Sequence, residues 1–184
     1  LNVDDFIQST MGALAQDGTQ YCLPYFAATV IMYYQIDIFE EAGITEPPTT
    51  FEELLEVAAK VHTEEIPAIA MRGRPGEAGN IWHWTMFLLG EGGSYFEDFP
   101  NDFTPTVNSE DAISGTEVYA ELMMNYSLPN AADAVYDDVV IAMQQGNVAI
   151  AIEGAPLGGR ILNPEQSRVI GNLGFAVVSG GDGG

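Results

Sequence analysis

Positive charge is the scarcest property of this sequence. Its 184 residues include 5 Lys and Arg against 27 Asp and Glu, which gives a formal net charge of -22. Phosphate backbones and anionic membrane surfaces are bound by clustered Lys and Arg side chains. Nucleic acid is therefore nearly excluded as a partner, and docking on an anionic membrane is disfavoured. The basic residues are Lys60, Arg72, Arg74, Arg160 and Arg168.

Cysteine and histidine, which form disulfides and the commonest transition-metal sites, are also few. Cys22 is the only cysteine, which excludes an intrachain disulfide and a zinc site built on cysteine. The two histidines, His62 and His83, lie far apart in the sequence and lack the spacing of known His-based metal motifs. We therefore expect no metal and no cofactor.

Long hydrophobic runs are absent as well. Residues 23–34 form the longest mostly apolar stretch, which is too short to span a bilayer. A hydrophobic content of 47% is nevertheless ample for one buried core. The chain opens on Leu1 and ends in a glycine-rich run without a visible signal peptide, so we expect a processed or excised segment of a longer protein.

Short apolar segments alternate with amphipathic ones along the chain. The first kind is typical of covered strands and the second of helices. We expect strands near residues 29–34, 67–71, 103–107, 147–152 and 173–178. We expect helices near residues 1–16, 38–43, 50–62, 81–89, 109–126, 137–145 and 154–162. This order predicts an α/β domain with a small, largely covered mixed sheet flanked by helices.

Two helix starts carry recognisable capping residues. Thr50 is followed three positions later by Glu53, the spacing of a capping box, after the helix-blocking pair Pro47-Pro48. Asn80 is expected to cap the helix over residues 81–89, and Asn108 or Ser109 the helix that ends near Tyr126.

Both tryptophans of the chain, Trp82 and Trp84, flank His83 at the start of a helix. Aromatic faces beside polar groups suit carbohydrate binding, because the C–H face of a sugar stacks on the ring. Side chains two positions apart on a helix point about 200° apart. At least one ring could therefore line a cleft, or both could simply pack against the protein. A lone histidine such as His83 is more often hydrogen-bonded or exposed than a ligand contact.

Catalytic motifs are missing, and acidic pairs are too common to single out a glycosidase pair. Glu153 is the one unusual carboxylate, because it follows the apolar strand expected over residues 147–152 and precedes Gly154. Ligands of α/β domains tend to bind beyond the carboxyl ends of strands. Glu153 could equally mark an exposed strand end, and both interpretations stay open.

Five segments in order resemble the extracellular solute-binding proteins of ABC transporters, a large sugar-binding family. Residues 21–24 are similar to its YGLP segment, residues 33–43 to YYNKDLFEEAG and residues 47–54 to PPTTWDEF. Residues 142–150 resemble its AFxxGKVAM unit and residues 173–178 its LGVAPLP strand. Two departures stand out, since Cys22 replaces a glycine and Pro156 replaces the usual stacking aromatic.

The resemblance implies a type II periplasmic-binding fold, in which two α/β lobes close on a ligand. Residues 1–24 would approach the hinge, residues 25–178 would form the second lobe, and residues 179–184 would be a linker or truncated end. The expected function is capture of a small neutral solute, most naturally a sugar or oligosaccharide, and delivery to the permease subunits of an ABC importer. The expected ligand-binding residues are Asn80, Trp82, His83, Trp84, Glu153 and Gly154.

The family implies a periplasmic or extracellular location, with lipid anchoring through a segment outside this chain as a further possibility. The expected protein is not an enzyme. A carbohydrate-active hydrolase that uses a carboxylate pair, and a protein-interaction domain built on the tryptophans, are the alternatives. A surface so rich in acid and poor in lysine also suggests adaptation to salt or to low external pH.

Overall fold

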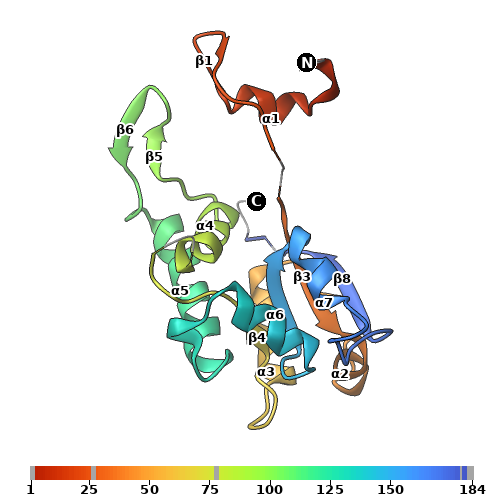
Figure 1. Ribbon diagram of the computed structural model, residues 1–184. Helices are drawn as coiled ribbons and strands as arrows, with labels where there is room; N and C mark the ends of the chain where they lie inside the picture. The colour runs from red at the N-terminus through yellow and green to blue at the C-terminus, as the bar shows by residue number, and fades with distance from the viewer. Residues whose placement is uncertain (1–2, 26–27, 77–78, 179, 182–184) are drawn as a thin grey trace.

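Four short strands form one mixed sheet in the order β4-β7-β3-β8 (Figure 1). The computed structural model describes residues 3–25, 28–76, 79–178 and 180–181. The strands are β3 (Val30–Gln35), β4 (Ile69–Ala70), β7 (Ile150–Gly154) and β8 (Leu173–Val177). β3 is antiparallel to β7 and to β8, whereas β4 is parallel to β7. The carboxyl ends of β4 and β7 therefore meet at one edge of the sheet.

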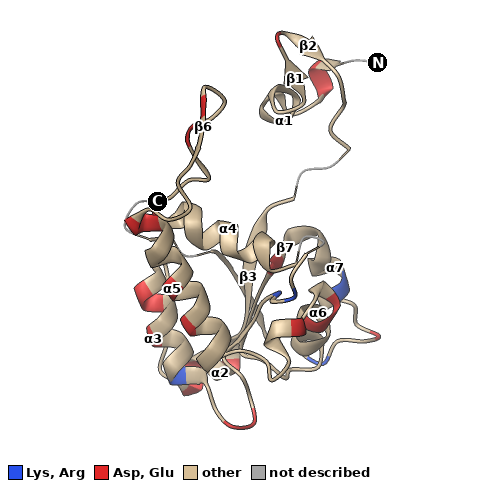
Figure 2. Cartoon of the chain, turned by 90° about the vertical axis from the view of Figure 1, so that its left-hand side faces the viewer, with Lys and Arg blue, Asp and Glu red and all other residues tan. Residues whose placement is uncertain are grey.

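Helices cover both faces of this sheet (Figures 1 and 2). One buried cluster joins the sheet to α3 (Phe51–Val61), α4 (Asn80–Gly90) and α5 (Glu110–Asn125). The other joins it to α6 (Tyr136–Gln144) and α7 (Gly158–Ile161). The short α2 (Ile36–Glu41) follows β3 directly. The predicted α/β arrangement with a small mixed sheet between helices is confirmed.

The capping predictions had two different outcomes. At the start of α3 the Thr50 hydroxyl accepts from the backbone N–H of Glu53 (3.1 Å), and the Glu53 carboxylate accepts from the backbone N–H of Thr50 (3.3 Å), which confirms the capping box. Ser109 caps α5 as expected. The Asn80 cap was wrong, because Gly79 holds the cap position and Asn80 is already the first residue of α4, without a side-chain cap bond.

The strand expected over residues 147–152 begins and ends later, at Ile150 and Gly154. Its register with β3 pairs Tyr34 with Ile150 and Val30 with Gly154, so the pairing partner sets the limits of β7. The carbonyl of Val148 instead accepts a hydrogen bond from the buried side chain of Gln35 (2.8 Å). Glu153 consequently lies inside the strand, on the α6 side of the sheet.

The N-terminal segment is less helical than predicted. It contains a 3-10 turn (Val3–Asp5), the short α1 (Gln8–Gly12) and a hairpin of β1 (Ala15–Gln16) and β2 (Thr19–Gln20). Met11 is its one buried hydrophobic side chain among the described residues, so little packing supports a longer helix.

A second hairpin, β5 (Phe96–Asp98) and β6 (Asp102–Pro105), stands off the same side of the sheet layers as the N-terminal segment (Figures 1 and 2). The remaining short elements are the 3-10 turns Ala131–Asp133 and Ala155–Leu157. In the part of the chain that the structure describes, no helix combines the length and apolarity needed to cross a membrane.

The chain end expected to be a linker falls partly outside the described residues, since Ser179 and residues 182–184 are not described. Gly180 is described and accepts a hydrogen bond from the Phe51 N–H (2.8 Å). Gly181 donates to the carbonyl of Gly90 (2.9 Å). The division of the chain at residues 24 and 178 remains a prediction.

Candidate ligand-binding site

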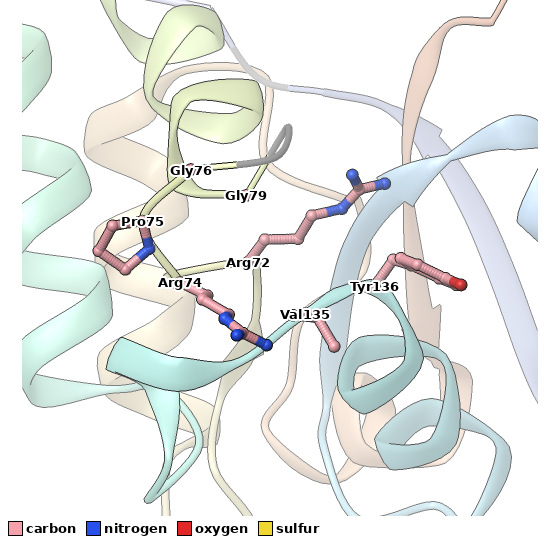
Figure 3. Close-up of a pocket in the computed structure, with 7 residues that line it drawn as sticks. All are labelled: Arg72, Arg74, Pro75, Gly76, Gly79, Val135 and Tyr136. Carbon is pink, nitrogen blue, oxygen red and sulfur yellow. The ribbon is translucent and has the colours of Figure 1, made fainter.

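A pocket of about 340 Å³ opens beyond the carboxyl end of β4, between the loop that follows this strand and the start of α6 (Figure 3). Arg72 extends from this loop across the pocket toward Tyr136, the first residue of α6. The lining residues are Arg72, Arg74, Pro75, Gly76, Gly79, Val135 and Tyr136. The site thus lies at the sheet edge where α/β domains usually bind ligands.

A buried ion pair joins the two parallel strands at this edge. The ladder between the two strands ends at the pair Ala70 and Ala151, and Arg72 and Glu153 each lie two residues beyond that pair. Glu153 is 0% exposed and the Arg72 side chain 13% exposed. The Arg72 Nε–H donates to Glu153 Oε2 (2.7 Å), and a second guanidinium nitrogen donates to Oε1. The Gly154 N–H also donates to Oε1 (2.6 Å).

This arrangement meets the conditions that a buried charge requires. An unpaired carboxylate away from water would cost several kcal/mol, whereas a bidentate guanidinium offsets much of that penalty. Of the two interpretations of Glu153, the structure excludes the exposed strand end, and a role in ligand binding stays a prediction. Glu153 is a buried, paired carboxylate at the strand's carboxyl end, and it is not exposed.

Aromatic rings flank the Arg72 guanidinium. Its central carbon lies 5.2 Å from the ring centre of Trp82 and 5.7 Å from that of Tyr136. Arg160 lies 5.8 Å from the same Tyr136 ring and pairs with Asp137 (2.7 Å). Cation–π contacts of this kind favour a guanidinium that stays in one place. Three of the five basic residues, Arg72, Arg74 and Arg160, thus lie in or beside this pocket.

His83 lies behind the pocket and is 0% exposed. Its Nδ1 accepts from the Arg72 backbone N–H (3.2 Å), so the ring proton is on Nε2, which donates to the carbonyl of Ile152 (2.8 Å). Burial lowers the pKa of His83 to about 4, although the nearby Glu153 charge opposes the shift. The imidazole is consequently neutral at physiological pH.

Two tyrosines complete the surroundings of the ion pair. The Tyr119 hydroxyl of α5 donates to the carbonyl of Arg72 (3.0 Å). The Tyr33 hydroxyl lies 3.4 Å from the carbonyls of Gly154 and Ala155. Burial raises the pKa of both tyrosines to about 12, and the Glu153 charge adds to the shift of Tyr33. Both hydroxyls therefore keep their protons and act as donors.

The expected ligand-binding residues separate into two groups. Trp82, His83, Glu153 and Gly154 meet around Arg72. Trp84 points elsewhere, because its Nε1 donates to the Thr116 hydroxyl of α5 (2.9 Å) and its ring packs edge-on against Tyr95. Asn80 is near the pocket through its backbone N–H, which donates to the carbonyl of Arg74 (2.9 Å).

Trp82 also lines a second, apolar pocket of about 360 Å³. Its other lining residues are Ala28, Val30, Ile81, Thr85 and Met86. The Trp82 Nε1 is buried and has no hydrogen-bond partner among the residues that the structure describes. Trp82 therefore contacts Arg72 and also lines the apolar pocket beside β3.

Arg72 and Tyr136 line the pocket but were not among the expected ligand-binding residues. A signal for Arg72 existed, since it is one of five basic residues and directly follows an expected strand, as Glu153 does. Tyr136 had no such signal, because its position depends on where α6 begins in space.

Comparisons with known proteins match this chain to solute-binding proteins. All of residues 1–184 match the family described as bacterial extracellular solute-binding protein. A mannitol-binding protein of Pseudomonas aeruginosa is 27% identical over 179 residues, which cover 95% of this chain and 40% of that protein. The chain thus spans less than half the length of that relative.

Solved structures of solute-binding proteins have the same fold as this chain. A solute-binding protein from Agrobacterium radiobacter K84 in complex with ribitol is 26% identical with a TM-score of 0.86, and the match covers 100% of this chain and 45% of that one. The maltose-bound MalE3 of T. maritima has a TM-score of 0.88 at 20% identity, and the match covers 100% of this chain and 46% of that one.

Proposed function

Because the chain belongs to the bacterial extracellular solute-binding protein family, we propose that it supplies one wall of the binding site in the substrate-binding component of an ABC importer. The solute is a neutral polyhydroxylated molecule, a sugar or a sugar alcohol. Closure of a second lobe over the pocket captures it, and the closed protein delivers it to membrane permease subunits. The location is periplasmic or extracellular.

The Arg72–Glu153 pair at the pocket is the observation that carries this proposal. The partly exposed guanidinium of Arg72 offers hydrogen-bond donors to the hydroxyl groups of a ligand, and the fully buried Glu153 carboxylate holds that guanidinium in place. The exposed Tyr136 ring beside it offers an apolar face for the C–H groups of the same ligand. Since Glu153 offsets the charge of Arg72, a neutral ligand suits the pair better than an anion does.

Several of the similar proteins support the same class of ligand. The names of the similar proteins include mannitol, ribitol and maltose, which are neutral and rich in hydroxyl groups. Of the expected residues, we propose that Glu153, Gly154 and Trp82 contribute to the site. His83 and Asn80 support it from behind, and Trp84 stabilises the contact of α4 with α5.

We propose that the site binds without catalysis. The relatives named above are binding proteins, and both oxygens of Glu153 are engaged by Arg72 and the Gly154 N–H. Turnover of aryl glycosides that is abolished by Glu153→Gln would overturn this part of the proposal and favour the hydrolase alternative.

Calorimetric titration of the natural polypeptide that contains these residues with D-mannitol, ribitol and maltose tests the proposal. At least one of these solutes should bind. Tyr136→Ala should raise its dissociation constant on the order of tenfold, because the variant lacks the aromatic ring. Phe103→Ala, which removes an exposed ring from the β5–β6 hairpin, is the matched control and should leave affinity unchanged. Equal losses in both variants would contradict the placement of the site.

The 184-residue chain alone should bind the same solutes weakly or not at all, because one wall cannot enclose a ligand. Tight binding by this chain in the same titration would contradict the closure mechanism.

A further inference from the structure

The backbone of Arg72 is held by side chains from two helices. His83 of α4 accepts from its N–H (3.2 Å), and Tyr119 of α5 donates to its carbonyl (3.0 Å). Arg72 lies beyond the last residue of β4, where the sheet ladder has ended. A residue in such a loop would ordinarily sample several conformations. Here two helices that pack on the sheet fix its main chain.

His83 makes a second bond that ties this loop to the opposite strand. Its Nε2–H donates to the carbonyl of Ile152, the residue before Glu153. The imidazole thus bridges the backbone of Arg72 to the strand that carries the carboxylate partner of Arg72. A single buried ring sets the separation of the two strand ends on which both members of the ion pair stand.

We propose that His83 is a positioning residue for ligand binding, which acts through the backbone of Arg72 and touches no ligand, and that Tyr119 assists it from α5. This inference rests on the proposed function, because it assumes that Arg72 binds the solute. It assigns to His83 a different role from direct ligand contact. Burial of its whole side chain leaves it no surface to offer a solute.

The two ring nitrogens can be tested separately. The amide of asparagine reaches about as far as Nδ1 of histidine, whereas the amide of glutamine reaches about as far as Nε2. His83→Asn can therefore keep an acceptor for the Arg72 N–H and lose the bond to Ile152. His83→Gln can keep the bond to Ile152 and lose the acceptor. Both variants shorten or reshape the same buried side chain, so each is the control for the other.

Calorimetry on the natural polypeptide, with whichever of D-mannitol, ribitol and maltose binds, gives the first readout. His83→Asn should keep the dissociation constant within about threefold, and His83→Gln should raise it on the order of tenfold, while both lower the thermal midpoint. In an Arg72→Lys background the two variants should bind alike, because the guanidinium that His83 positions through the backbone is gone. Tyr119→Phe should weaken binding less than His83→Gln does.

Equal affinities of the Asn and Gln variants would overturn the proposal, and so would a difference that persists in the Arg72→Lys background. A readout without ligand separates this proposal from the function itself. In nitrogen-15 NMR the Arg72 Nε–H should exchange slowly with water in the parent protein and in His83→Asn, and faster in His83→Gln. If no probe binds but exchange follows this order, the function fails and the positioning role stands. Uniform exchange rates would overturn the positioning role.

Discussion

The pocket and the outer helix faces differ in the sign of the charged side chains that they gather and in how far those side chains are buried. Three of the five basic residues lie in or beside the pocket, where Glu153 is buried and bonded on both oxygens. The outer faces of α3, α5 and α6 carry acidic side chains, most of them in contact with water (Figure 2). Glu53 and Glu153 represent the two regions, since both accept backbone N–H bonds but only Glu153 has a cationic partner.

The difference shows which charges the fold depends on. A solvated carboxylate keeps most of its hydration, so its removal changes little. A buried carboxylate has lost its hydration and depends on one guanidinium. We therefore expect sensitivity to substitution to concentrate at the pocket, although most of the charge lies elsewhere.

The largest effect is expected at the ion pair. Glu153→Ala leaves Arg72 without its carboxylate and should lower the free energy of unfolding by about 3–5 kcal/mol, measured by urea denaturation. The double variant Arg72→Met/Glu153→Leu removes both charges and should cost clearly less. A loss below about 1 kcal/mol for Glu153→Ala would mean that the pair is solvated and resembles the outer faces.

Next in size is the pH dependence caused by His83. Its folded pKa of about 4 lies below the ordinary 6.5, so the unfolded chain binds the proton more readily between these values. The contribution of neutral His83 to the free energy of unfolding is fully present above pH 6.5. It amounts to roughly 3 kcal/mol and is lost as the pH falls toward 4. Burial dominates over the opposing charge of Glu153, while Arg72 acts with burial.

Denaturation of the parent protein and His83→Asn across this pH range measures the contribution. The stability difference between them should shrink on acidification. A constant difference would indicate that the imidazole is solvated in the folded state.

A smaller loss is expected at the α3 cap on the outer surface. Thr50→Ala removes the acceptor for the Glu53 N–H and should cost about 1 kcal/mol, measured by thermal denaturation. Thr45→Ala, at an exposed residue in the loop before α3, is a control for loss of a surface hydroxyl.

Acid should remove a second part of the same cap. The N–H and hydroxyl of Thr49 and the N–H of Thr50 lower the pKa of Glu53, so its contribution is present above the ordinary carboxyl pKa and is lost as the pH falls through the lowered value. Glu53→Ala should therefore destabilise the protein more at pH 7 than at pH 3. An equal effect at both values would contradict the capping role of the ionised carboxylate.

The smallest effects are expected from single outer carboxylates. Glu117→Gln on α5 should change the free energy of unfolding by no more than about 0.5 kcal/mol, and the change should fall as sodium chloride is added. The thermal midpoint of the parent protein should rise with salt, because salt screens the mutual repulsion of a chain at -22. A midpoint that did not rise would count against adaptation to salt.

Local features of the fold were predictable where neighbouring residues decide them. The Thr50–Glu53 box and the strand at residues 30–35 depend on side chains within a few positions, and both were expected. Asn80 failed as a cap because Gly79 occupies the cap position and donates to the carbonyl of Gly76 (2.7 Å), a backbone arrangement that composition does not reveal. The limits of β7 depended on its partner β3.

The site was only partly predictable for the same reason. Helical geometry required Trp82 and Trp84 to point apart, and they do, but it could not tell which of them faces Arg72. His83 was expected to be either exposed or hydrogen-bonded, and both of its nitrogens are bonded.

By itself the sequence determined the shortage of cations, the alternation of helices and strands, and the resemblance to solute-binding proteins. Only the tertiary structure decided that Arg72 meets Glu153, which is 81 positions away. Their contact follows from the parallel register of β4 and β7, a choice among strands that depends on burial of the whole sheet. Because the energy of a charge depends on its surroundings, the importance of one carboxylate among so many became visible only when those surroundings were known.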